Sequence, residues 1–384
     1  MVDVLIAGAG PAGAVAALVL ARAGVDVLVV DRARFPRDKL CGDTLNPGAI
    51  ALLRRLGIAG AIESAGLALD GMLLTGATGV SVDVRYPAPF AGRALSRRVL
   101  DGLLLDAAVR AGARVELGAA VTAPIVETVA GVTRVAGATV RMAGGDVRIP
   151  AAVTIAADGR RSTLAFSLGL ARHPRTPRRW AVGTRYEGVD GLAARGEMHI
   201  RSGHYVGIAP LPGGLASVCV VTPCRAGFDE PAAVVARALA GDARLRDRFA
   251  SARGVEPCTV LGPLAVDARA AGMPGLLLAG DAAGFIDPMT GDGLRFAIGG
   301  GWLAAQTAVD WLARPELRAW AHLAHRRHRA FGWKRRFDRV LRRVVASPAS
   351  IRVAAAGAAI APILARQLVT LAGDVPLARR LEAR

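Results

Sequence analysis

Short apolar runs alternate with glycine-rich turns along this chain, and the first thirty-one residues show the pattern most clearly. The apolar run at residues 2–6 predicts a short buried strand, and the alanine-rich stretch at residues 14–23 predicts a helix. A second apolar run, residues 25–30, ends on Asp31 and predicts another buried strand. Because strand, helix and strand follow one another directly, the opening segment predicts a βαβ unit with parallel strands.

The turn between the first strand and the helix carries three glycines in the spacing Gly8-x-Gly10-x-x-Gly13. Gly8 permits a tight turn, Gly10 lets the backbone approach a pyrophosphate, and Gly13 lets helix and strand pack closely. The helix N-terminus favours phosphate because its free N–H groups and its dipole attract negative charge. Asp31 stands eighteen residues past Gly13, where an acid can bind ribose hydroxyls. The turn therefore predicts a dinucleotide site, and this motif alone leaves both FAD and NAD open.

The chain between residues 32 and 111 predicts loops and helices. A charged loop containing Pro36 and Gly42 follows the second strand, at the sheet edge where doubly wound folds bind ligands. Asn46 and Pro47 together predict the start of a helix that ends near residue 56. Ser96 is the predicted N-cap of a further helix over residues 97–111.

Most remaining segments before residue 266 predict strands. Residues 69–75 and 80–86 predict a hairpin inserted into the parallel sheet. A β-meander followed by a buried strand is predicted at residues 114–117, 120–127, 133–138, 140–149 and 153–157. The arginine- and proline-rich residues 172–179 read as a linker, and residues 180–266 predict mostly strands with one helix near 232–240.

The last third of the chain returns to the first domain. Residues 276–279 predict a buried strand ending on Gly280-Asp281, and Gly293 opens an apolar helix to about residue 313. We therefore predict an α/β fold with a Rossmann-type dinucleotide-binding domain, an inserted and mostly antiparallel β-sheet substrate domain, and a helical C-terminal region. The predicted boundaries are residues 1–168 and 267–313 for the first domain, 169–266 for the substrate domain and 314–384 for the C-terminal region.

Charge and hydropathy narrow the classes of partner. The net charge of +18 comes almost entirely from arginine, since Lys39 and Lys334 are the only lysines. Residues 325–343 hold nine Lys and Arg side chains against Asp338 alone, which leaves a peripheral contact with anionic lipid open. No nucleic-acid fold signature accompanies this basic stretch, so we expect no nucleic-acid partner. No run reaches the roughly eighteen apolar residues of a membrane-spanning helix.

Cysteine spacing bears on metal sites and on the compartment. Cys41, Cys219, Cys224 and Cys258 form no CxxC pair and no pattern with histidines, so we expect neither a metal site nor a disulfide framework. Because the glycine motif begins at residue 8, we also expect no secretory leader. We therefore expect a cytoplasmic protein, one that can lie against the inner face of the membrane.

Three separated motifs together resemble the flavoproteins of the group A aromatic monooxygenase superfamily. They are the glycine turn, Asp158-Gly159 after a mid-chain strand, and Gly280-Asp281 after a late strand. The resemblance implies FAD as the cofactor, with Asp281 on the ribitol or ribose, Arg97 near the pyrophosphate and Val121 near the adenine. Taken together, the cofactor-binding residues that we predict are Gly8, Gly10, Ala12, Gly13, Asp31, Arg32, Cys41, Gly42, Arg97, Val121, Asp158, Gly280, Asp281, Gly291, Gly293 and Leu294.

Two further stretches are similar to the geranylgeranyl reductase branch of this superfamily. Residues 35–42, FPRDKLCG, resemble its F-P-R-x-K-x-C-G motif, and residues 280–293 resemble its GDAAG…P-x-T-G-[DE]-G motif. Gly284 stands where aromatic hydroxylases carry a histidine. The W-x-W-x-I-P motif of flavin-dependent halogenases has no match among the five tryptophans, and neither lysine is placed as the halogenase lysine is. At residues 205–210 this chain keeps the tyrosine and proline of the reductases' Y-x-W-x-F-P stretch but not its tryptophan and phenylalanine.

The resemblance implies one of two redox reactions. The first is reduction of a C=C bond in an isoprenoid or lipid-like, apolar small molecule by hydride from flavin N5, and the second is a monooxygenase reaction of secondary metabolism. NAD(P)H would bind transiently as the reductant, or a protein would donate the electrons. Cys41 is the candidate proton donor or gate, and Asp43 and Asp287 are further polar candidates that also suit loop caps. His204, Tyr205 and Pro210 are the residues that we predict in the substrate pocket.

Overall fold

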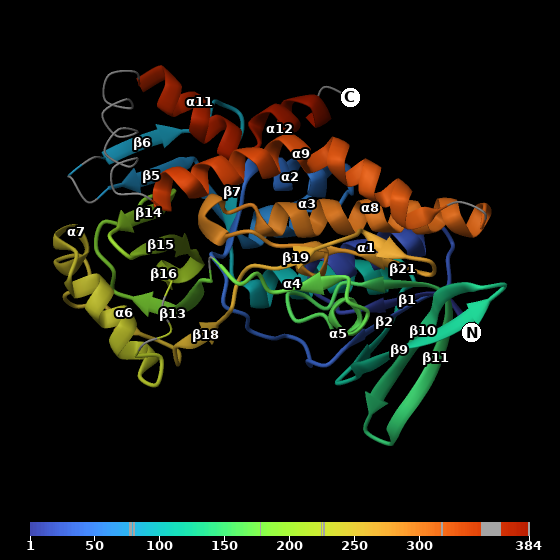
Figure 1. The fold of residues 1–384 in the computed structure, drawn as a ribbon. Coiled ribbons are helices and arrows are strands. Elements are labelled where there is room, and N and C mark those ends of the chain that lie inside the picture. Colours follow the sequence, from blue (N-terminus) through green and yellow to red (C-terminus); the bar gives the residue numbers. More distant parts are fainter. Residues whose placement is uncertain are drawn as a thin grey trace.

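The computed structural model describes residues 1–76, 79, 81–176, 178–223, 225, 227–315, 318–346 and 362–382. Val80, Cys224 and part of the predicted C-terminal helical region lie outside these ranges. Two large sheets form the framework, with helices between and above them (Figure 1). The mixed α/β architecture with a parallel nucleotide-binding sheet, a second antiparallel sheet and C-terminal helices confirms the predicted fold class.

The first large sheet carries the glycine turn at the end of its central strand. Strand β1 (Val2–Ala7) pairs in parallel with β11 (Gly145–Ala156) and β2 (Val27–Asp31), and the sheet continues in parallel to β21 (Leu276–Leu278) and β8 (Arg114–Leu117). Strand β20 (Gly272–Met273) closes one edge in antiparallel orientation. Helix α1 (Pro11–Arg22) begins directly after the turn and is buried along most of its length, as its alanine-rich sequence predicts.

The meander has fewer and longer strands than the sequence predicts. Strands β9 (Ala120–Val129) and β10 (Val132–Met142) pair with each other, and β11 continues without a break from the meander into the parallel sheet. The break predicted near residue 139 is wrong, because Gly137 keeps the strand continuous through a bulge with φ of +131°. A β-carbon on Gly137 would lie 2.1 Å from the carbonyl oxygen of Ile149.

The second large sheet is assembled from two segments far apart in the sequence. Its order is β17-β13-β16-β15-β14-β5-β6, with β18 paired to β13. The predicted hairpin of β5 and β6 exists, but it extends this sheet through a parallel pairing of β5 with β14 and does not enter the first sheet. The backbone of β5 pairs along the edge that β14 would otherwise expose. The strands are β5 (Gly71–Thr75), β6 (Ser81–Arg85), β13 (Trp180–Glu187), β14 (Arg195–Arg201), β15 (His204–Leu211), β16 (Leu215–Thr222), β17 (Arg253–Gly254) and β18 (Thr259–Leu261).

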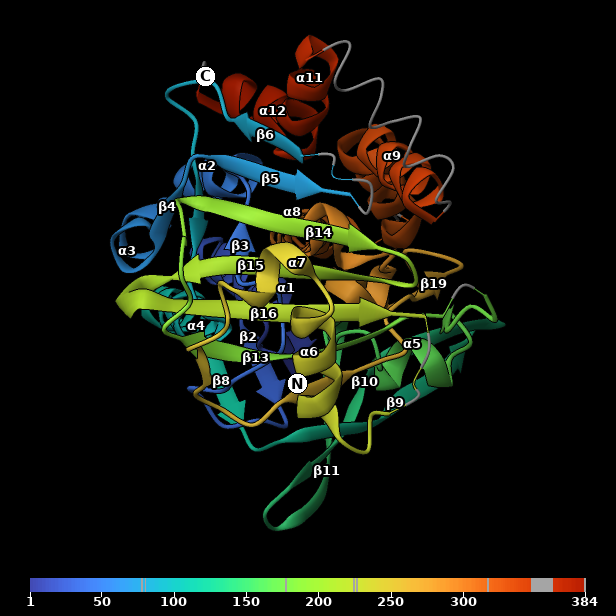
Figure 2. The ribbon, with the colours of Figure 1, turned by 90° about the vertical axis from the view of Figure 1, so that its left-hand side faces the viewer.

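One face of the second sheet packs on helix α6 (Pro231–Ala240), whose Val235 and Leu239 join a buried cluster with β13, β15 and β16 (Figure 2). The opposite face turns toward the first domain. The other helices and strands up to residue 268 are β3 (Thr44–Leu45), α2 (Pro47–Arg55), α3 (Ala59–Ala65), β4 (Leu67–Leu69), β7 (Gly92–Ala94), α4 (Arg97–Arg110), α5 (Thr163–Ser167), β12 (Ala171–Arg172), α7 (Ala243–Arg246) and β19 (Asp267–Ala268).

Both predicted helix caps are confirmed. The Asn46 side chain accepts a hydrogen bond from Ala49 N at 2.9 Å, and Ser96 accepts one from Val99 N at 3.3 Å. Each satisfies one backbone donor in the first turn of its helix. These two caps fix where α2 and α4 begin.

The C-terminal helices cover the first domain and reach back to the second sheet. Helix α8 (Gly293–Ala313) packs on α1, and α9 (Ala319–Ala346) packs on α8, while α12 (Val375–Glu382) packs on α2 (Figure 1). Helix α11 (Pro362–Ala372) contacts β6. Within the described residues, no helix combines the length and apolar character needed to cross a membrane.

Helices α1 and α8 meet backbone to backbone. A β-carbon on Gly301 in α8 would lie 2.1 Å from the carbonyl oxygen of Ala12 in α1, and one on Gly13 would lie 1.8 Å from that of Gly8. Both obstacles are main-chain atoms, so a change of side-chain rotamer cannot relieve the clash. The N-terminus of α1 is therefore held in place from two sides by glycines.

Replacing Gly301 with alanine should lower the free energy of unfolding by about 1–3 kcal/mol, as expected for overpacking a core contact. Gly102 in α4 is the matched control, since a β-carbon there meets no atom within 4 Å. Gly102→Ala should leave stability unchanged or raise it by about 0.5–1 kcal/mol, because alanine favours a helix. Urea unfolding of the two variants measures this, and equal stabilities would contradict the proposed close contact.

Candidate functional site

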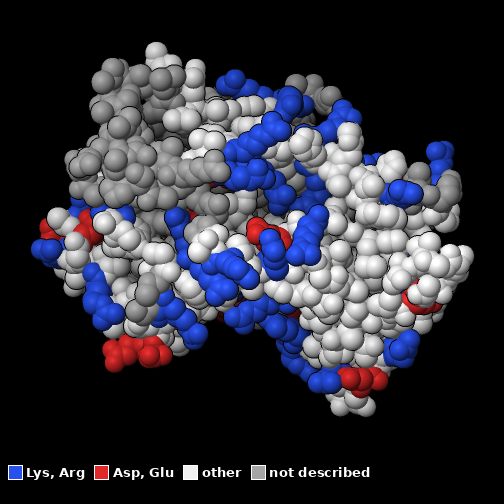
Figure 3. Space-filling view, in the orientation of Figure 1, with Lys and Arg blue, Asp and Glu red and all other residues white. Residues whose placement is uncertain are grey.

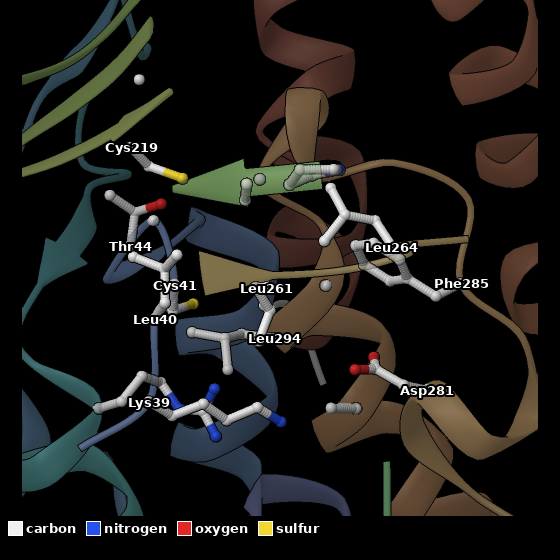
Figure 4. Close-up of a pocket in the computed structure, with 18 of the residues that line it drawn as sticks. Lys39, Leu40, Cys41, Thr44, Cys219, Leu261, Leu264, Asp281, Phe285 and Leu294 are labelled. Atoms are coloured by element: carbon white, nitrogen blue, oxygen red, sulfur yellow. The ribbon is translucent and has the colours of Figure 1, made fainter. Parts of the chain in front are cut away.

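A cavity of about 190 Å³ lies between the first domain and the inner face of the second sheet. Its walls come from the α1 turn, the charged loop, the 280–297 segment and strands β5 and β13–β16. In the view of Figure 4, Lys39 and Asp281 lie at the lower end, with Leu261, Leu264 and Phe285 above them. The cavity therefore has a charged end and an apolar end.

The charged end surrounds the N-terminus of α1. Gly10 is the N-cap, and the first internal bond of the helix runs from Ala14 N to the Gly10 carbonyl at 2.9 Å, which leaves the earlier N–H groups free. A β-carbon on Gly10 would have a single close neighbour, a guanidinium nitrogen of Arg37 at 3.4 Å. The helix end thus faces a space bordered by a cation.

Positive charge exceeds negative charge around this helix end. The cations are Arg37, Lys39, Arg97 and Arg160, and the carboxylates are Asp101 and Asp281. Burial, opposed by Asp281, lowers the pKa of Arg160 to about 10, and burial and Arg97 lower the pKa of Lys39. The Nε atoms of Arg37 and Arg160 are buried without a hydrogen-bond partner. Asp43, whose carboxylate accepts from Arg97 N at 3.2 Å, adds a third acid, but the cations still exceed the carboxylates, which fits a pyrophosphate.

Arg97 is fixed by a bidentate ion pair. Its Nε and one terminal nitrogen each lie 2.7 Å from the Asp101 carboxylate, one turn further along α4, and both residues are buried. Burial alone would lower the pKa of Arg97, but the Asp101 charge raises it, so the guanidinium stays charged. The sequence singled out this arginine, and the structure places it in the cavity wall.

The GD loop forms the floor of the same end. Gly280 and Asp281 both line the cavity, and a β-carbon on Gly280 would lie 2.9 Å from that of Ala12. This glycine therefore lets the GD loop approach the α1 turn closely. Gly10, Ala12, Cys41, Gly42, Arg97, Gly280, Asp281, Gly291, Gly293 and Leu294, all predicted from the sequence, line the one cavity.

Other predicted cofactor residues lie outside the cavity wall. Gly8 and Gly13 make close backbone contacts beneath the turn, and Arg32 is exposed. Asp31 accepts hydrogen bonds from Ala9 N and Ala33 N, each at 2.8 Å. Asp158 accepts one from Thr163 N at 2.8 Å, and its other carboxylate oxygen is buried without a partner. Val121, in β9, packs against a buried cluster that includes Val135, Val140 and Leu276.

Cys41 and Cys219 both line the cavity, from the charged loop and from β16. Burial raises the pKa of each thiol, that of Cys219 to about 12, so both are protonated at neutral pH. Asp43 follows Cys41 closely and is buried, and burial raises its pKa to about 6. The Asp43 backbone N–H donates to the Cys41 sulfur.

The apolar end contains side chains that the sequence did not identify. They come from β5, β14, β16 and the segment after β17, and they are Met72, Met198, Cys219, Leu261 and Leu264. The predicted pocket residues His204, Tyr205 and Pro210 do not line the cavity. His204 begins β15, whereas the cavity faces Gly207 to Ala209, further along the strand. The prediction named other residues of β15 than those that line the cavity, because sequence spacing does not reveal which part of a strand faces a cavity.

Tyr205 instead supports the loop that closes the cavity. Its buried hydroxyl donates to Asp287 at 2.7 Å, and Arg179 donates to the other oxygen of that carboxylate at 2.9 Å. Burial and the Asp287 charge raise the pKa of Tyr205 far above its ordinary value, so it remains a donor. Asp287 also caps the short helix that begins at Pro288, by accepting from Met289 N at 3.1 Å. This is the loop-cap role that we considered for Asp287.

A polar network in β14 was missed entirely. Glu197 lines the cavity and accepts from Arg248 at 2.7 and 2.8 Å, and His199 Nε2 lies 2.8 Å from the same carboxylate. Burial alone would raise the pKa of Glu197, but the bonds from Arg248 and His199 lower it to about 2. Along β14, Glu197 and His199 alternate with the apolar Met198 and Ile200, so the two polar side chains share one face of the strand. This alternation is the sequence signal that could have indicated the network.

The far wall is tied to the C-terminal helices. Asp292, between Gly291 and Gly293, is buried against Lys334 of α9, with 3.1 Å between Oδ2 and Nζ. Lys334 also donates to the carbonyls of Leu371 and Ala372 at 2.9 and 2.8 Å, and Asn46 donates to the second oxygen of Asp292 at 2.9 Å. The start of α8 is thereby positioned by three other helices.

Comparisons with known proteins agree with these features. The model of the FAD binding domain family matches residues 1–305. Menaquinone reductase of Mycolicibacterium smegmatis is 31% identical over 88% of this chain and 84% of its own length. Digeranylgeranylglycerophospholipid reductase 2 of Methanopyrus kandleri is 31% identical over 80% of this chain and 77% of its own.

Among solved structures, the flavin-dependent brominase Bmp2 superposes with a TM-score of 0.83 at 22% identity, over 97% of this chain and 93% of that one. At this identity the likeness concerns the fold alone. The sequence relatives therefore decide between the branches, and they confirm the resemblance to the geranylgeranyl reductase branch.

Gly10→Ala should weaken FAD binding at least about tenfold, because a methyl group would stand where a pyrophosphate meets the helix end. Folding should be unaffected, since the only atom within 3.4 Å is the end of the flexible Arg37 side chain. Gly60→Ala in α3, where a β-carbon meets nothing within 4 Å, is the control. Fluorescence titration of the apo-protein with FAD measures both, and unchanged affinity in Gly10→Ala would contradict this placement.

Proposed function

The chain belongs to the FAD binding domain family and, within it, to the geranylgeranyl reductase branch, and from this premise we propose that it reduces a C=C bond of an isoprenoid or similarly lipid-like substrate. The observation that carries this proposal is the two-ended cavity. Its charged end suits a pyrophosphate, and its other end is lined by Met72, Met198, Ile208 and leucines. An apolar chain gains free energy by leaving water for such a lining.

The cofactor contacts remain a proposal that rests on this arrangement. The free N–H groups of α1, together with Arg37 and Arg160, would hold the pyrophosphate. Asp281 would hold a sugar hydroxyl, and Gly291, Gly293 and Leu294 would border the ring. A bound and reduced FAD supplies hydride to the alkene. The excess of positive charge at the helix end would be reduced by a bound diphosphate.

Proton delivery is assigned to Cys41. Its thiol lines the cavity and is held protonated by burial, so Sγ carries a proton for the alkene carbon that does not receive hydride. Asp43 lies next to it with a pKa near 6 and can return a proton to the sulfur. Leu294, Leu261 and Leu264 keep water away from this space.

The electron donor and the cellular setting complete the proposal. We infer that NAD(P)H acts as a transient reductant or that a protein donates the electrons, since the described residues show one nucleotide-binding sheet of this type. We also infer a cytoplasmic protein that meets its lipid-like substrate at the membrane surface. The basic face of α9, with exposed Trp333 and Val340, suits such a contact.

Anaerobic single-turnover experiments test the reaction. The reduced flavoprotein should be reoxidised by a menaquinone with an unsaturated prenyl chain or by a digeranylgeranyl lipid in the absence of oxygen. Mass spectrometry should show two hydrogens added to the prenyl chain, measured for the menaquinone after any quinol has been oxidised back to the quinone. Reoxidation that requires oxygen and inserts an oxygen atom into the substrate would establish a monooxygenase and overturn the proposal.

Cys41→Ala should slow substrate-dependent flavin reoxidation by about a hundredfold, the scale of losing a positioned general acid. Cys219→Ala is the matched control, because it removes a second protonated thiol from the same cavity. The rate of flavin reduction and the FAD content should be unchanged in both variants. If the two variants lose the same activity, the thiol of Cys41 serves packing and not proton transfer.

A further inference from the structure

A second pocket, of about 350 Å³, lies between helix α9 and the strand segment that precedes β20. The 280–285 loop separates it from the cavity, since Asp281 and Phe285 line the cavity while Ala283 lines the pocket. The polar side chains of its wall are all basic: Arg269, Arg327, His328, Arg335, Arg336 and Arg339. None of these residues has a part in the proposed reduction.

No carboxylate neutralises this group. Among the described residues, none of the five arginines forms an ion pair with an acid. The Asp338 charge acts on Arg335 but forms no ion pair with it, and burial and the neighbouring Asp292 raise the pKa of Asp338 above its ordinary value. The pocket therefore concentrates positive charge without an internal counter-ion.

Two guanidinium groups are anchored and still have free donors. Arg327 donates to the Ala283 carbonyl at 2.6 Å, and Arg335 donates to the Gly284 carbonyl at 3.1 Å. A β-carbon on Gly284 would lie 3.0 Å from the Arg335 guanidinium, so glycine permits this approach. Each guanidinium has five N–H donors, and the carbonyl bonds use only one or two of them. The remaining donors are fixed in direction before any ligand arrives.

A buried guanidinium without a counter-ion raises the free energy of the folded protein. The side chain of Arg327 is largely enclosed, and burial together with the nearby Arg335 charge lowers its pKa to about 9. An anion in the pocket would remove this repulsion and accept several charge-assisted hydrogen bonds at once. The donors come from several turns of α9 and from the segment before β20, so they suit a tetrahedral anion with more than one charge. A carboxylate is planar and carries one charge, so it would use fewer of these donors.

We propose that the pocket between α9 and residues 268–271 binds a phosphate group through Arg327, Arg335, Arg336 and Arg339. Either the headgroup of an anionic phospholipid or a soluble diphosphate would supply such a phosphate group. Lys and Arg side chains gather over α9 on the face shown in Figure 3, and Trp333 and Val340 on the same helix are 38% and 58% exposed. A headgroup in the pocket would let these two apolar side chains enter the lipid surface. The inference does not depend on the proposed reaction.

The test uses the FAD-loaded full-length protein and the charge reversal R336E/R339E. Both arginines are exposed and make no hydrogen bond or ion pair with the other described residues, so the variant should fold and keep its flavin. Arg148→Glu, at an exposed arginine in the β10–β11 hairpin, is the control for reversing a charge away from the pocket. A second variant, R336K/R339K, keeps the charge and should bind within a few-fold of wild type.

Inorganic diphosphate is titrated by calorimetry, and vesicles of phosphatidylglycerol or of phosphatidylcholine alone are tested by co-flotation. We expect R336E/R339E to bind the effective probe at least about tenfold more weakly than wild type and Arg148→Glu. Binding of diphosphate without vesicles identifies a soluble ligand, and binding of phosphatidylglycerol vesicles alone identifies a headgroup; both support the pocket. Failure of wild type to bind either probe, or equal binding by R336E/R339E, overturns it.

Discussion

Everything at the cofactor end depends on a main-chain contact that leaves no room for one methyl group. The N-terminus of α1 lies between Gly8 of its own turn, Gly280 of the late loop and Gly301 of α8. Gly8 lies nearly three hundred residues before Gly280 and Gly301 in the chain. Their close approach aims the free N–H groups of α1 into the cavity and fixes how the 280–293 segment lies against them. The site can form only when the first and last parts of the nucleotide-binding domain have packed together.

The 280–293 segment distributes this constraint to the rest of the molecule. Asp281 faces the charged end, Met289 and Leu294 face the apolar end, and Asp287 is held by Tyr205 and Arg179 from the second sheet. At its end, Asp292 is held by Lys334 of α9 and by Asn46. One short segment thus connects both sheets and the C-terminal helices through charged or hydrogen-bonded side chains, which are costly to separate once buried. A change in any of these supports should reach the cavity.

The parts predicted well from sequence are those decided by local chemistry. The glycine turn and the caps at Asn46 and Ser96 follow from residue spacing within a single element, whereas Arg97 was indicated by the family resemblance and not by spacing alone. The parts predicted poorly depend on pairing between distant segments. The partner of β5 is β14, more than a hundred residues later, and the hydrophobic pattern of β5 suits either sheet equally well. His204 and Tyr205 were placed in the pocket because of a motif, but the position along β15 decides which side chains face the cavity. Glu197 gains its role from Arg248, which no local pattern connects to it.

The central claim is that the α1 turn and the GD loop hold the flavin while the second sheet supplies the apolar wall. A crystal structure of the protein with FAD and an unreactive isoprenoid analogue tests this most directly. The account predicts the pyrophosphate against the N–H groups that follow Gly10, the isoalloxazine beside Leu294 and Cys41, and the isoprenoid among Met72, Met198 and Leu261. A flavin whose phosphates lie instead among the arginines of α9, or an isoprenoid outside the cavity, would contradict it.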